Sequence, residues 1–369
     1  KASMEELDTD VLDFGLGCLF GAFIGDAMGV YLEGRGDTPS CIDVLRAADM
    51  RGGGILAVAP GQITDDSEMA LSLARGLIHG TNDQSDATII PLNHIAREYV
   101  RWYRSPPFDV GNTCKAALKS ADKYPMTATE CKPKKLWADC LRNTSQRENV
   151  DSKSNGSLMR CTPLALWCHK LSPDQQGYCG FQDSLMTHPN ETTCIAEGSY
   201  LITCAHLITH PKDVEGAILA AKTWIERKNR ESEVLEWLID AENQKLSFAL
   251  HNIGYCKHAY VRAYYHLSQR SDFMESMKET LAAGGDTDTN AAIVGGMMGA
   301  FHGYNSLPQN LVEKLINCDT AKGRPRPDIF RTTNAKETGT ELLRLAPSCI
   351  QEFQWKVGQP LDFSKYRKA

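Results

Sequence analysis

The stretch Leu281–Tyr304, LAAGGDTDTNAAIVGGMMGAFHGY, constrains the fold of this chain more than any other. Gly284 and Gly285 permit a tight turn, and a helix is expected to follow with Asp286 and Asp288 in its first turn. Acids are common at helix starts, so this pattern alone is also typical of a simple cap. The rest of the helix, however, carries small and apolar residues on every side and is expected to be buried. The sequence therefore predicts two carboxylates at a buried helix end, which need cations.

A second acidic cluster opens another helix earlier in the chain, at Gln62–Met69, QITDDSEM. Here Thr64 supplies a hydroxyl beside Asp65 and Asp66. Four carboxylates brought together would repel one another strongly unless divalent cations lay between them. Magnesium and manganese prefer such oxygen ligands. We therefore expect the two clusters to meet at one metal site, although about 220 residues separate them in the sequence.

Composition narrows the class of protein. The chain has 369 residues, 42% hydrophobic and 23% charged, which is typical of a globular protein, and a net charge of −6 offers no basic surface for nucleic acid. Thirteen cysteines without a C-x-x-C pair support neither a zinc site nor a disulfide framework. A cytoplasmic location follows as an expectation, with the nucleus as the alternative.

The N-terminal region carries no signal-peptide pattern, because residues 5–10 are acidic where a signal peptide would be basic. Lys1-Ala2-Ser3 ahead of Met4 has the form of a cloning remnant, so residues 1–10 are expected to be a tail and residues 11–369 a single domain. The apolar run Phe14–Ile24 is about half the length of a membrane span and Asp26 follows it, which predicts a core helix and no membrane partner.

Helical periodicity dominates the chain and strand-like runs are nearly absent. The glycine-rich segment 51–61 is expected to hold a short strand, and the polar residues 126–153 a surface connection. Since no repeat or linker divides the chain, we predict an all-α fold, a single compact orthogonal helical bundle whose two ends meet at the site. Helices are expected at 11–33, 66–80, 92–104, 114–124, 191–208, 213–227, 232–242, 256–268, 271–283 and 336–346, and one more with Pro163 near its start.

Six motifs occur in order along the chain: GDAMG at 25–29 with Glu33 after it, TDDSEMAL from Thr64, DVGNT from Asp109, SNGSLMR at 154–160, THPN at 187–190 and GGDTDT at 284–289. Together they resemble the ADP-ribosylhydrolase (ADP-ribosylglycohydrolase) family, most closely its dinitrogenase-reductase-activating glycohydrolase branch. The resemblance extends from the 21–29 helix to Gly303. It implies an all-α bundle with a central cleft that holds two magnesium ions, with manganese as the alternative.

The resemblance also implies roles for individual residues. Asp65, Asp66 and Asp288 are candidates to act as base or to orient water, and Glu33 resembles a loop glutamate that touches the metal or gates the cleft. Asn290 departs from the family pattern, which has a small residue or threonine there. The implied metal ligands are Thr64, Asp65, Asp66, Asp286, Asp288 and Thr289.

The remaining motifs resemble the substrate-binding parts of the family. The Ser154, Asn155, Gly156 and Ser157 segment would present amides to the diphosphate at a helix start. Asp109, Gly111 and Asn112 resemble loop residues that face the distal ribose and the departing guanidinium. His188 resembles a cleft histidine near the adenosine.

The expected reaction is magnesium-dependent removal of ADP-ribose from a modified protein, with ADP-ribosylarginine as the favoured linkage and ADP-ribose as the product. O-linked ADP-ribose (ADP-ribosylserine, poly(ADP-ribose) or O-acetyl-ADP-ribose) and a non-catalytic ADP-ribose-binding or structural relative are the alternatives. The enzyme is expected to be a monomer.

Two other readings of Asp286-Thr287-Asp288 fit poorly. A haloacid-dehalogenase phosphatase would need a buried strand before the D-x-D motif, where this chain has glycines. A calcium loop would need Gly and Glu where Ala291 and Met297 occur.

Overall fold

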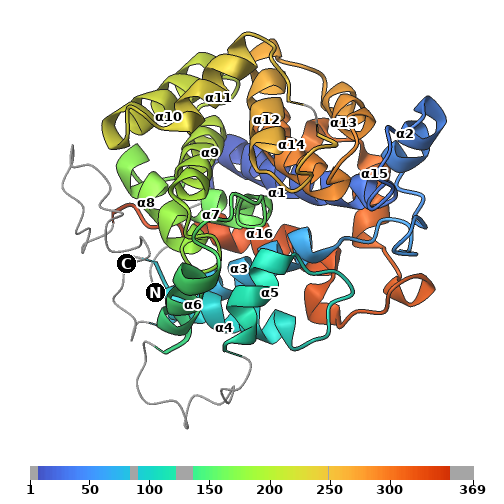
Figure 1. Cartoon of the computed structure of the whole chain (residues 1–369), viewed down its shortest axis with the longest axis horizontal. Coiled ribbons are helices and arrows are strands. Elements are labelled where there is room, and N and C mark those ends of the chain that lie inside the picture. Colours follow the sequence, from blue (N-terminus) through green and yellow to red (C-terminus); the bar gives the residue numbers. More distant parts are fainter. Residues whose placement is uncertain (1–6, 84–89, 122–135, 248, 350–369) are drawn as a thin grey trace.

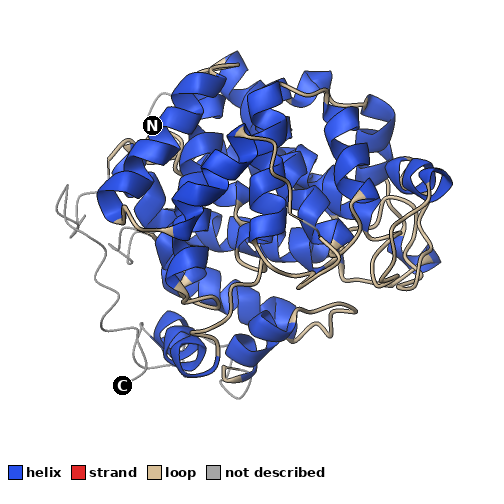
Figure 2. Ribbon diagram, turned by 45° about the horizontal axis from the view of Figure 1, so that its top comes forward, coloured by secondary structure: helices blue, strands red, loops and turns tan. Residues whose placement is uncertain are grey.

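The computed structural model describes residues 7–83, 90–121, 136–247 and 249–349, and in this part of the chain all regular secondary structure is helical (Figures 1 and 2). The predicted all-α class is confirmed. The short strand expected at 51–61 is wrong: only one isolated bridge forms there, between Gly53 and Val58. The α-helices are α1 Thr9–Gly29, α2 Cys41–Ala48, α3 Asp65–Asn82, α4 Leu92–Tyr103, α5 Asn112–Lys119, α6 Leu136–Glu148, α7 Thr162–Trp167, α8 Pro173–Ser184, α9 Glu191–Thr209, α10 Val214–Lys228, α11 Glu233–Glu242, α12 Lys257–Gln269, α13 Phe273–Ala282, α14 Thr287–His302, α15 Gln309–Ile316 and α16 Ala335–Arg344.

Helices α1 and α14 pack against each other with almost no side chains between them, in the middle of the molecule (Figure 1). A Cβ atom added to Gly21 would lie 2.2 Å from the carbonyl oxygen of Gly295, and one added to Gly25 would lie 2.0 Å from that of Ala291. Both distances are far inside van der Waals contact, so these positions require glycine. The two helices run in opposite directions. Hence the end of α1 and the start of α14 lie at the same end of the seam.

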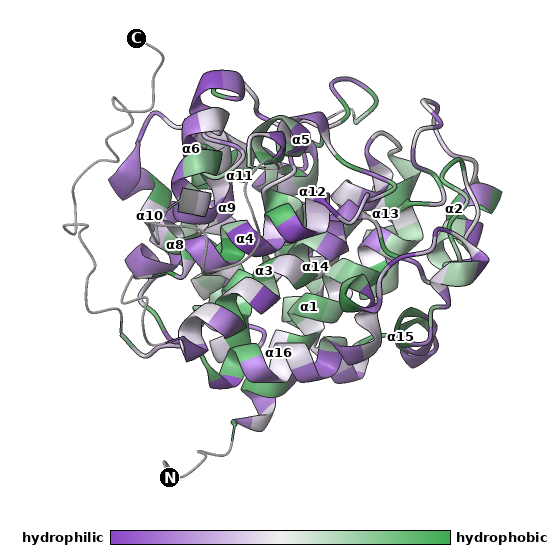
Figure 3. Ribbon diagram, turned by 90° about the horizontal axis from the view of Figure 1, so that it is seen from below, coloured by the Kyte–Doolittle hydropathy of each residue, from purple (hydrophilic) through white to green (hydrophobic). Residues whose placement is uncertain are grey.

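Helix α1 is buried along most of its length, from Phe14 to Gly29. Among the described residues it is the one helix whose length and hydropathy would suit a membrane span, and 83% of its apolar window lies inside the fold. The helix has 21 residues, so its apolar part is longer than the run seen in the sequence. Its burial against α14 matches the expected core helix. Figure 3 shows hydrophobic colouring along α1 and hydrophilic colouring mainly on the outside of the molecule.

Four helices were absent from the sequence prediction: α2, α6, α8 and α15. Residues 136–148 form a helix, so the expectation of an irregular connection there is wrong; residues 122–135 lie outside the described part. In α6, Trp137, Ala138 and Leu141 make a short buried stripe that the surrounding polar residues obscure. Helix α8 begins with a capping box, in which Ser172 and Gln175 satisfy each other's backbone amides.

Buried apolar side chains form a core that reaches from Leu16 in α1 to Leu343 in α16. The C-terminal helix α16 packs on α1, where a Cβ atom at Gly339 would lie 2.7 Å from Leu16. The two ends of the described chain therefore share one core. This arrangement holds the start of α3 beside the α1–α14 seam.

Candidate active site and metal centre

Three helix ends bring acids from distant parts of the sequence together. Asp26 lies in the last turn of α1, Asp65 and Asp66 open α3, and Asp286 and Asp288 open α14. The close packing of the α1 glycines on α14, which we call the glycine seam, sets the distance between the end of α1 and the start of α14. The two acidic clusters predicted from the sequence do meet.

The carboxylate of Asp26, in α1, caps the N-terminus of α3, where the N-cap residue Thr64 makes no side-chain capping bond. The Asp26 carboxylate accepts hydrogen bonds from the Thr64 amide (3.0 and 3.1 Å) and the Ser67 amide (3.1 Å). The Thr64 hydroxyl lies between two carboxylates, 2.9 Å from Asp26 and 3.0 Å from Asp66. Free amides at a helix start favour an acceptor. Asp26 thus fixes the direction in which α3 presents Asp65 and Asp66.

Two groups of acids lie close enough to share a cation. Asp26, Asp66 and Asp288 form one group and Glu33, Asp286 and Asp288 the other, and within each group one oxygen of every residue lies within 4.8 Å of the others. Asp288 belongs to both groups, as a carboxylate between two ions would. Asp26, Asp66 and Asp288 are at most 3% exposed.

Burial makes these carboxylates poor anions in the metal-free protein. It raises the pKa of Asp26 to about 6. Burial, with repulsion from Asp286 second, raises the pKa of Glu33 to about 7. For Asp66 and Asp288 burial again has the largest effect, and repulsion from neighbouring acids raises their pKa further. All of these shifts have one cause: negative charge is confined without an adjacent positive group.

The residues present fit divalent cations. Oxygen Oδ1 of Asp66 is buried and has no hydrogen-bond partner, so one ligand position is free. In the described part of the chain no lysine or arginine forms an ion pair with any acid of the two groups. Carboxylate and hydroxyl oxygens are the ligands that magnesium and manganese prefer. Thr289 is buried next to Asp288, whose carboxylate accepts the Thr289 amide at 2.9 Å.

Glu33 reaches across from the loop after α1 to cap α14. Its carboxylate accepts a hydrogen bond from the Thr287 amide at 2.9 Å and lies 3.3 Å from the Thr287 hydroxyl. Glu33 is therefore placed at the acidic cluster and not on a detached surface loop. Its expected gating role stays a prediction.

The loop at 109–112 borders the cluster on the α3 side. The Gly111 amide donates a hydrogen bond of 3.2 Å to Asp65. Asp109 is half-buried, and burial together with repulsion from Asp286 raises its pKa. Asp109 thus faces the acids, whereas Asn112 starts α5 and is exposed.

The loop at 154–157 borders the cluster on the other side. The side-chain amide of Asn155 donates to Asp286 at 2.8 Å, and the Asn155 backbone amide donates to Gly254 at 3.0 Å. The Ser157 hydroxyl is buried against Ser184, 3.1 Å away. The loop leads into a 3-10 turn, Leu158–Arg160. Its backbone is therefore held rigidly beside Asp286.

His188 supports this loop from behind. Its side chain is fully buried, with Nε2 3.0 Å from the Ser154 hydroxyl and Nδ1 2.8 Å from the Thr187 hydroxyl. A Cβ atom at Gly156 would lie 3.0 Å from the His188 ring, so the loop must pass close to it. Burial and the charge of Arg160 lower the His188 pKa, which keeps the ring neutral. Its expected contact with adenosine stays a prediction.

A cavity of about 590 Å³ lies beside the 154–157 loop, between residues 151–154 and 252–255. Gly254 is part of its wall, and a Cβ atom there would lie 3.6 Å from Asp286. The cavity thus adjoins the acidic cluster. Its volume suits part of a ligand of nucleotide size.

Two parts of this site were missing from the sequence prediction. Asp26 is the only charged residue between Phe14 and Tyr31, and an acid inside such an apolar helix was the available signal. The 252–255 segment carries no comparable signal, since only the fold brings it to the cavity. The six predicted ligands lie at the starts of α3 and α14, and three of them, Asp66, Asp286 and Asp288, belong to the two groups of acids. The role of all six as ligands stays a prediction.

A model of the ADP-ribosylglycohydrolase family matches residues 7–346, which include all three helix ends of the acidic site. The chain belongs to the ADP-ribosylglycohydrolase family and is a hydrolytic enzyme.

Among its relatives is the ADP-ribosyl-[dinitrogen reductase] glycohydrolase of Rhodospirillum rubrum, 27% identical over 310 residues that cover 83% of this chain and 91% of the relative. Another is the ADP-ribosylarginine hydrolase Tri1 of Serratia proteamaculans, 26% identical over 330 residues that cover 84% of this chain and 77% of the relative.

A solved structure described as an ADP-ribosylglycohydrolase-related protein complex superimposes with a TM-score of 0.66. It covers 92% of this chain and all of that chain at 22% identity, which supports the fold.

Proposed function

We propose that this enzyme is a magnesium-dependent hydrolase that removes ADP-ribose from arginine side chains of modified proteins. The observation that carries the proposal is the pair of acid groups that share Asp288 and have no internal cation among the described residues. Buried carboxylates of this kind require divalent ions, and two ions bound there would hold ribose hydroxyls and lower the pKa of a water molecule. Manganese would fit the same oxygen ligands.

The protein's own groups would bind the substrate on both sides of the cluster. In the loop Ser154, Asn155, Gly156 and Ser157, the amides of Gly156 and Ser157 would bind the diphosphate. The Asn155 backbone amide already donates to Gly254 and its side chain to Asp286, which fixes the loop. The adjoining cavity would take the nucleoside half of ADP-ribose. This arrangement would bring the ribose carbon that carries the leaving group to the acids.

Hydrolysis breaks the bond between the ribose anomeric carbon and the guanidinium nitrogen. Water adds to that carbon, its proton passes to a carboxylate, and the departing guanidine takes up a proton. Asp65, Asp66 and Asp288 are the candidate proton acceptors. Positive charge that develops on the ribose in the transition state would be stabilised by the surrounding acids.

Arginine is favoured as the leaving group because of Asp109. A departing guanidinium is cationic and planar, and a carboxylate beside its exit would stabilise it. Asp109 lies next to Asp65 and Asp286 but belongs to neither group of candidate ligands, so it is free for this role. The Serratia relative is named as an ADP-ribosylarginine hydrolase, which supports the same choice.

The decisive experiment compares two substrates that share ADP-ribose. Arginine-linked and serine-linked ADP-ribosylated proteins are incubated with the enzyme, with magnesium or with EDTA, and free ADP-ribose is measured. We expect release from the arginine linkage with magnesium and none with EDTA. Faster release from the serine linkage, or full activity in EDTA, would contradict the proposal.

A further inference from the structure

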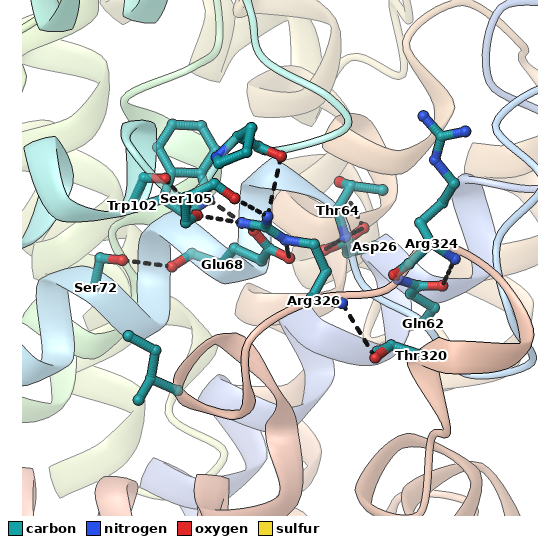
Figure 4. A network of polar contacts seen from close by, with 12 residues as sticks. Asp26, Gln62, Thr64, Glu68, Ser72, Trp102, Ser105, Thr320, Arg324 and Arg326 are labelled. Atoms are coloured by element: carbon teal, nitrogen blue, oxygen red, sulfur yellow. Dashed lines mark hydrogen bonds and ion pairs between the residues drawn. The ribbon is translucent and has the colours of Figure 1, made fainter.

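The segment 324–330 crosses from the C-terminal part of the chain to the start of α3 and to the loop at 105–111 (Figure 4). It comes after Gly303, beyond the motifs that define the site. We refer to residues 324–330 as the C-terminal strap. The strap contacts α3, which carries Asp65, and the loop at 105–111, which carries Asp109.

Arg326 makes the central contact of the strap. Its guanidinium has five N–H donors, and all five are used. Two reach the carboxylate of Glu68, each at 2.8 Å, one reaches the Ser105 hydroxyl at 2.6 Å, and the others reach the backbone carbonyls of Ser105 (2.6 Å) and Pro106 (3.2 Å). The Arg326 side chain is only 3% exposed. One buried cation thus joins the first turn of α3 to the start of the 105–111 loop.

A neighbouring residue of the strap holds the same two elements. The backbone amide of Arg324 donates to Gln62 at 3.0 Å, and Gln62 lies two residues before Thr64. The Arg324 guanidinium lies 5.5 Å from the ring centroid of Phe108, the residue before Asp109. The strap therefore contacts the loop at its start and again beside Asp109.

The loop in turn contacts the acids. From Ser105 it leads to Asp109 and to Gly111, whose amide bonds to Asp65. Loop and helix α3 are thus tied at both ends of the loop, by Arg326 at one end and by Gly111 at the other. A lysine in place of Arg326 could not span both partners, because its single ammonium lacks the planar fork of a guanidinium.

We propose that Arg326 is a positioning residue that fixes Asp109 relative to Asp65 and thereby sets the leaving group the enzyme accepts. This inference rests on the proposed function for its kinetic consequence, but its structural part does not. Without Arg326 the loop loses three hydrogen bonds at its start and Glu68 loses two, while Asp26, Asp66, Asp286 and Asp288 and the cavity keep their own contacts. Selectivity for the arginine linkage would then fall more than binding of ADP-ribose.

Hydrogen exchange tests the structural part without any substrate. In Arg326→Met we expect the amides of Ser105 and of residues 108–111 to exchange about tenfold faster or more, because local opening becomes easier. Arg331→Met is the matched control: Arg331 pairs with the exposed Asp328 and with the Cys318 carbonyl, and none of its bonds reaches the loop. Unchanged exchange in a folded Arg326→Met protein would overturn the proposal.

Ser105→Ala keeps the inference testable if Arg326→Met does not fold. This substitution removes the hydroxyl that accepts from Arg326 and donates to the Trp102 carbonyl, and it leaves the Glu68–Arg326 ion pair intact. We expect faster exchange in the same loop by about threefold to tenfold, the scale of one or two lost hydrogen bonds. Exchange equal to that of the wild type would count against the proposal.

Kinetics test the functional part. We expect Arg326→Met to lower kcat/KM on the arginine-linked substrate by about 10- to 100-fold, the scale of a small misplacement of a reacting group. The Kd for ADP-ribose should change less than about twofold, a small part of the 1.4 kcal/mol that a tenfold change represents. Equal losses in ADP-ribose affinity and in turnover would indicate a general structural role and overturn the positioning role.

The two proposals fail in different ways. If the wild type releases no ADP-ribose from arginine, the proposed function is wrong, and exchange in the 105–111 loop still decides whether Arg326 fixes that loop. If the wild type is active but Arg326→Met and Ser105→Ala behave like Arg331→Met, the proposed function stands and the role of Arg326 is wrong.

Discussion

Asp66 and Glu68 lie two residues apart in the first turn of α3, and each is 1% exposed, yet their surroundings are opposite. Glu68 receives the guanidinium of Arg326 and the Trp102 indole N–H at 2.7 Å. Asp66 has a carboxylate oxygen with no partner and further acids nearby. Burial of an acid is therefore no sign of function by itself. Among the described residues, the lack of a lysine or arginine paired with its acids is what separates this acidic cluster from Glu68.

A second paired site strengthens the comparison. Arg160 and Asp183 are both fully buried and lie 3.0 Å apart, and the Tyr99 hydroxyl donates to Asp183 at 2.8 Å. Here the protein supplies its own counter-charge. We call Glu68–Arg326 and Arg160–Asp183 the paired sites, and the following predictions test how they differ from the acidic centre.

The largest expected effect is loss of turnover when the acidic centre is changed. Asp65→Asn or Asp288→Asn should lower kcat by about 100-fold or more, because each removes a candidate ligand and proton acceptor. Asp319→Asn is the control, since Asp319 lies outside the motifs, where it caps a 3-10 turn and pairs with the exposed Lys322. Steady-state release of ADP-ribose measures all three. Similar losses of kcat at all three positions would show that turnover does not depend specifically on the acidic centre.

Breaking a paired site should instead reduce stability whether or not metal is present. Arg160→Met leaves Asp183 buried without its counter-charge, which should cost about 3–5 kcal/mol of unfolding free energy. Arg227→Met is the matched control, because its pair with Asp174 is 39% exposed on the arginine side and should contribute about 0–1 kcal/mol. Urea unfolding with and without EDTA gives both values. A loss of unfolding free energy in Arg160→Met, relative to the wild type, that differs strongly between magnesium and EDTA would contradict the distinction.

Metal binding and pH should change the stability of the protein through the acidic centre and not through the paired sites. The folded-state pKa values of Asp26 and Glu33 lie above the ordinary values of 3.8 and 4.5, at about 6 and about 7. The folded metal-free protein therefore binds more protons than the unfolded chain between about pH 4 and 7, and it loses stability as pH rises through that window. Magnesium at 100 times its Kd should restore about 2.7 kcal/mol at high pH. Melting curves at pH 5.5 and 8, with EDTA or magnesium, test this; a metal-free protein that is more stable at pH 8 would refute it.

The smallest expected effect concerns the leaving group. Asp109→Ala should lower kcat/KM for the arginine-linked substrate about tenfold, the scale of one lost electrostatic contact in the transition state. ADP-ribose affinity, measured by calorimetry, should change little because the nucleotide half is held by other residues. Asp109 is a ribose ligand or a loop cap instead if both quantities fall together.

Sequence patterns predicted the all-α class, the main long helices and the meeting of the two acidic clusters, because each rests on strong local signals. The uncharged helix after Asp286 was expected to be buried, and the hydroxyl–carboxylate runs at two helix starts were expected to lie together. Short helices such as α2 and α6 were missed, since one buried stripe among polar residues gives little periodicity.

The paired sites could not be predicted from sequence. Nothing local distinguishes Glu68 from Asp65, and its partner lies 258 residues further on. The capping role of Asp26 also depends on how α1 and α3 approach each other. Contacts of this kind are properties of the assembled fold.

The glycine seam has a consequence for how the protein is made. Gly29 and Thr287, bonded through a carbonyl and a hydroxyl, are 258 residues apart. At ribosomal rates of about 5–20 residues per second, α1 would leave the ribosome about 13–52 s before its partner. Until then the glycine face of α1 lacks its native partner α14. During synthesis this face must be protected from non-native contacts in some other way. The same delay keeps the repelling acids apart until the rest of the core is available to hold them.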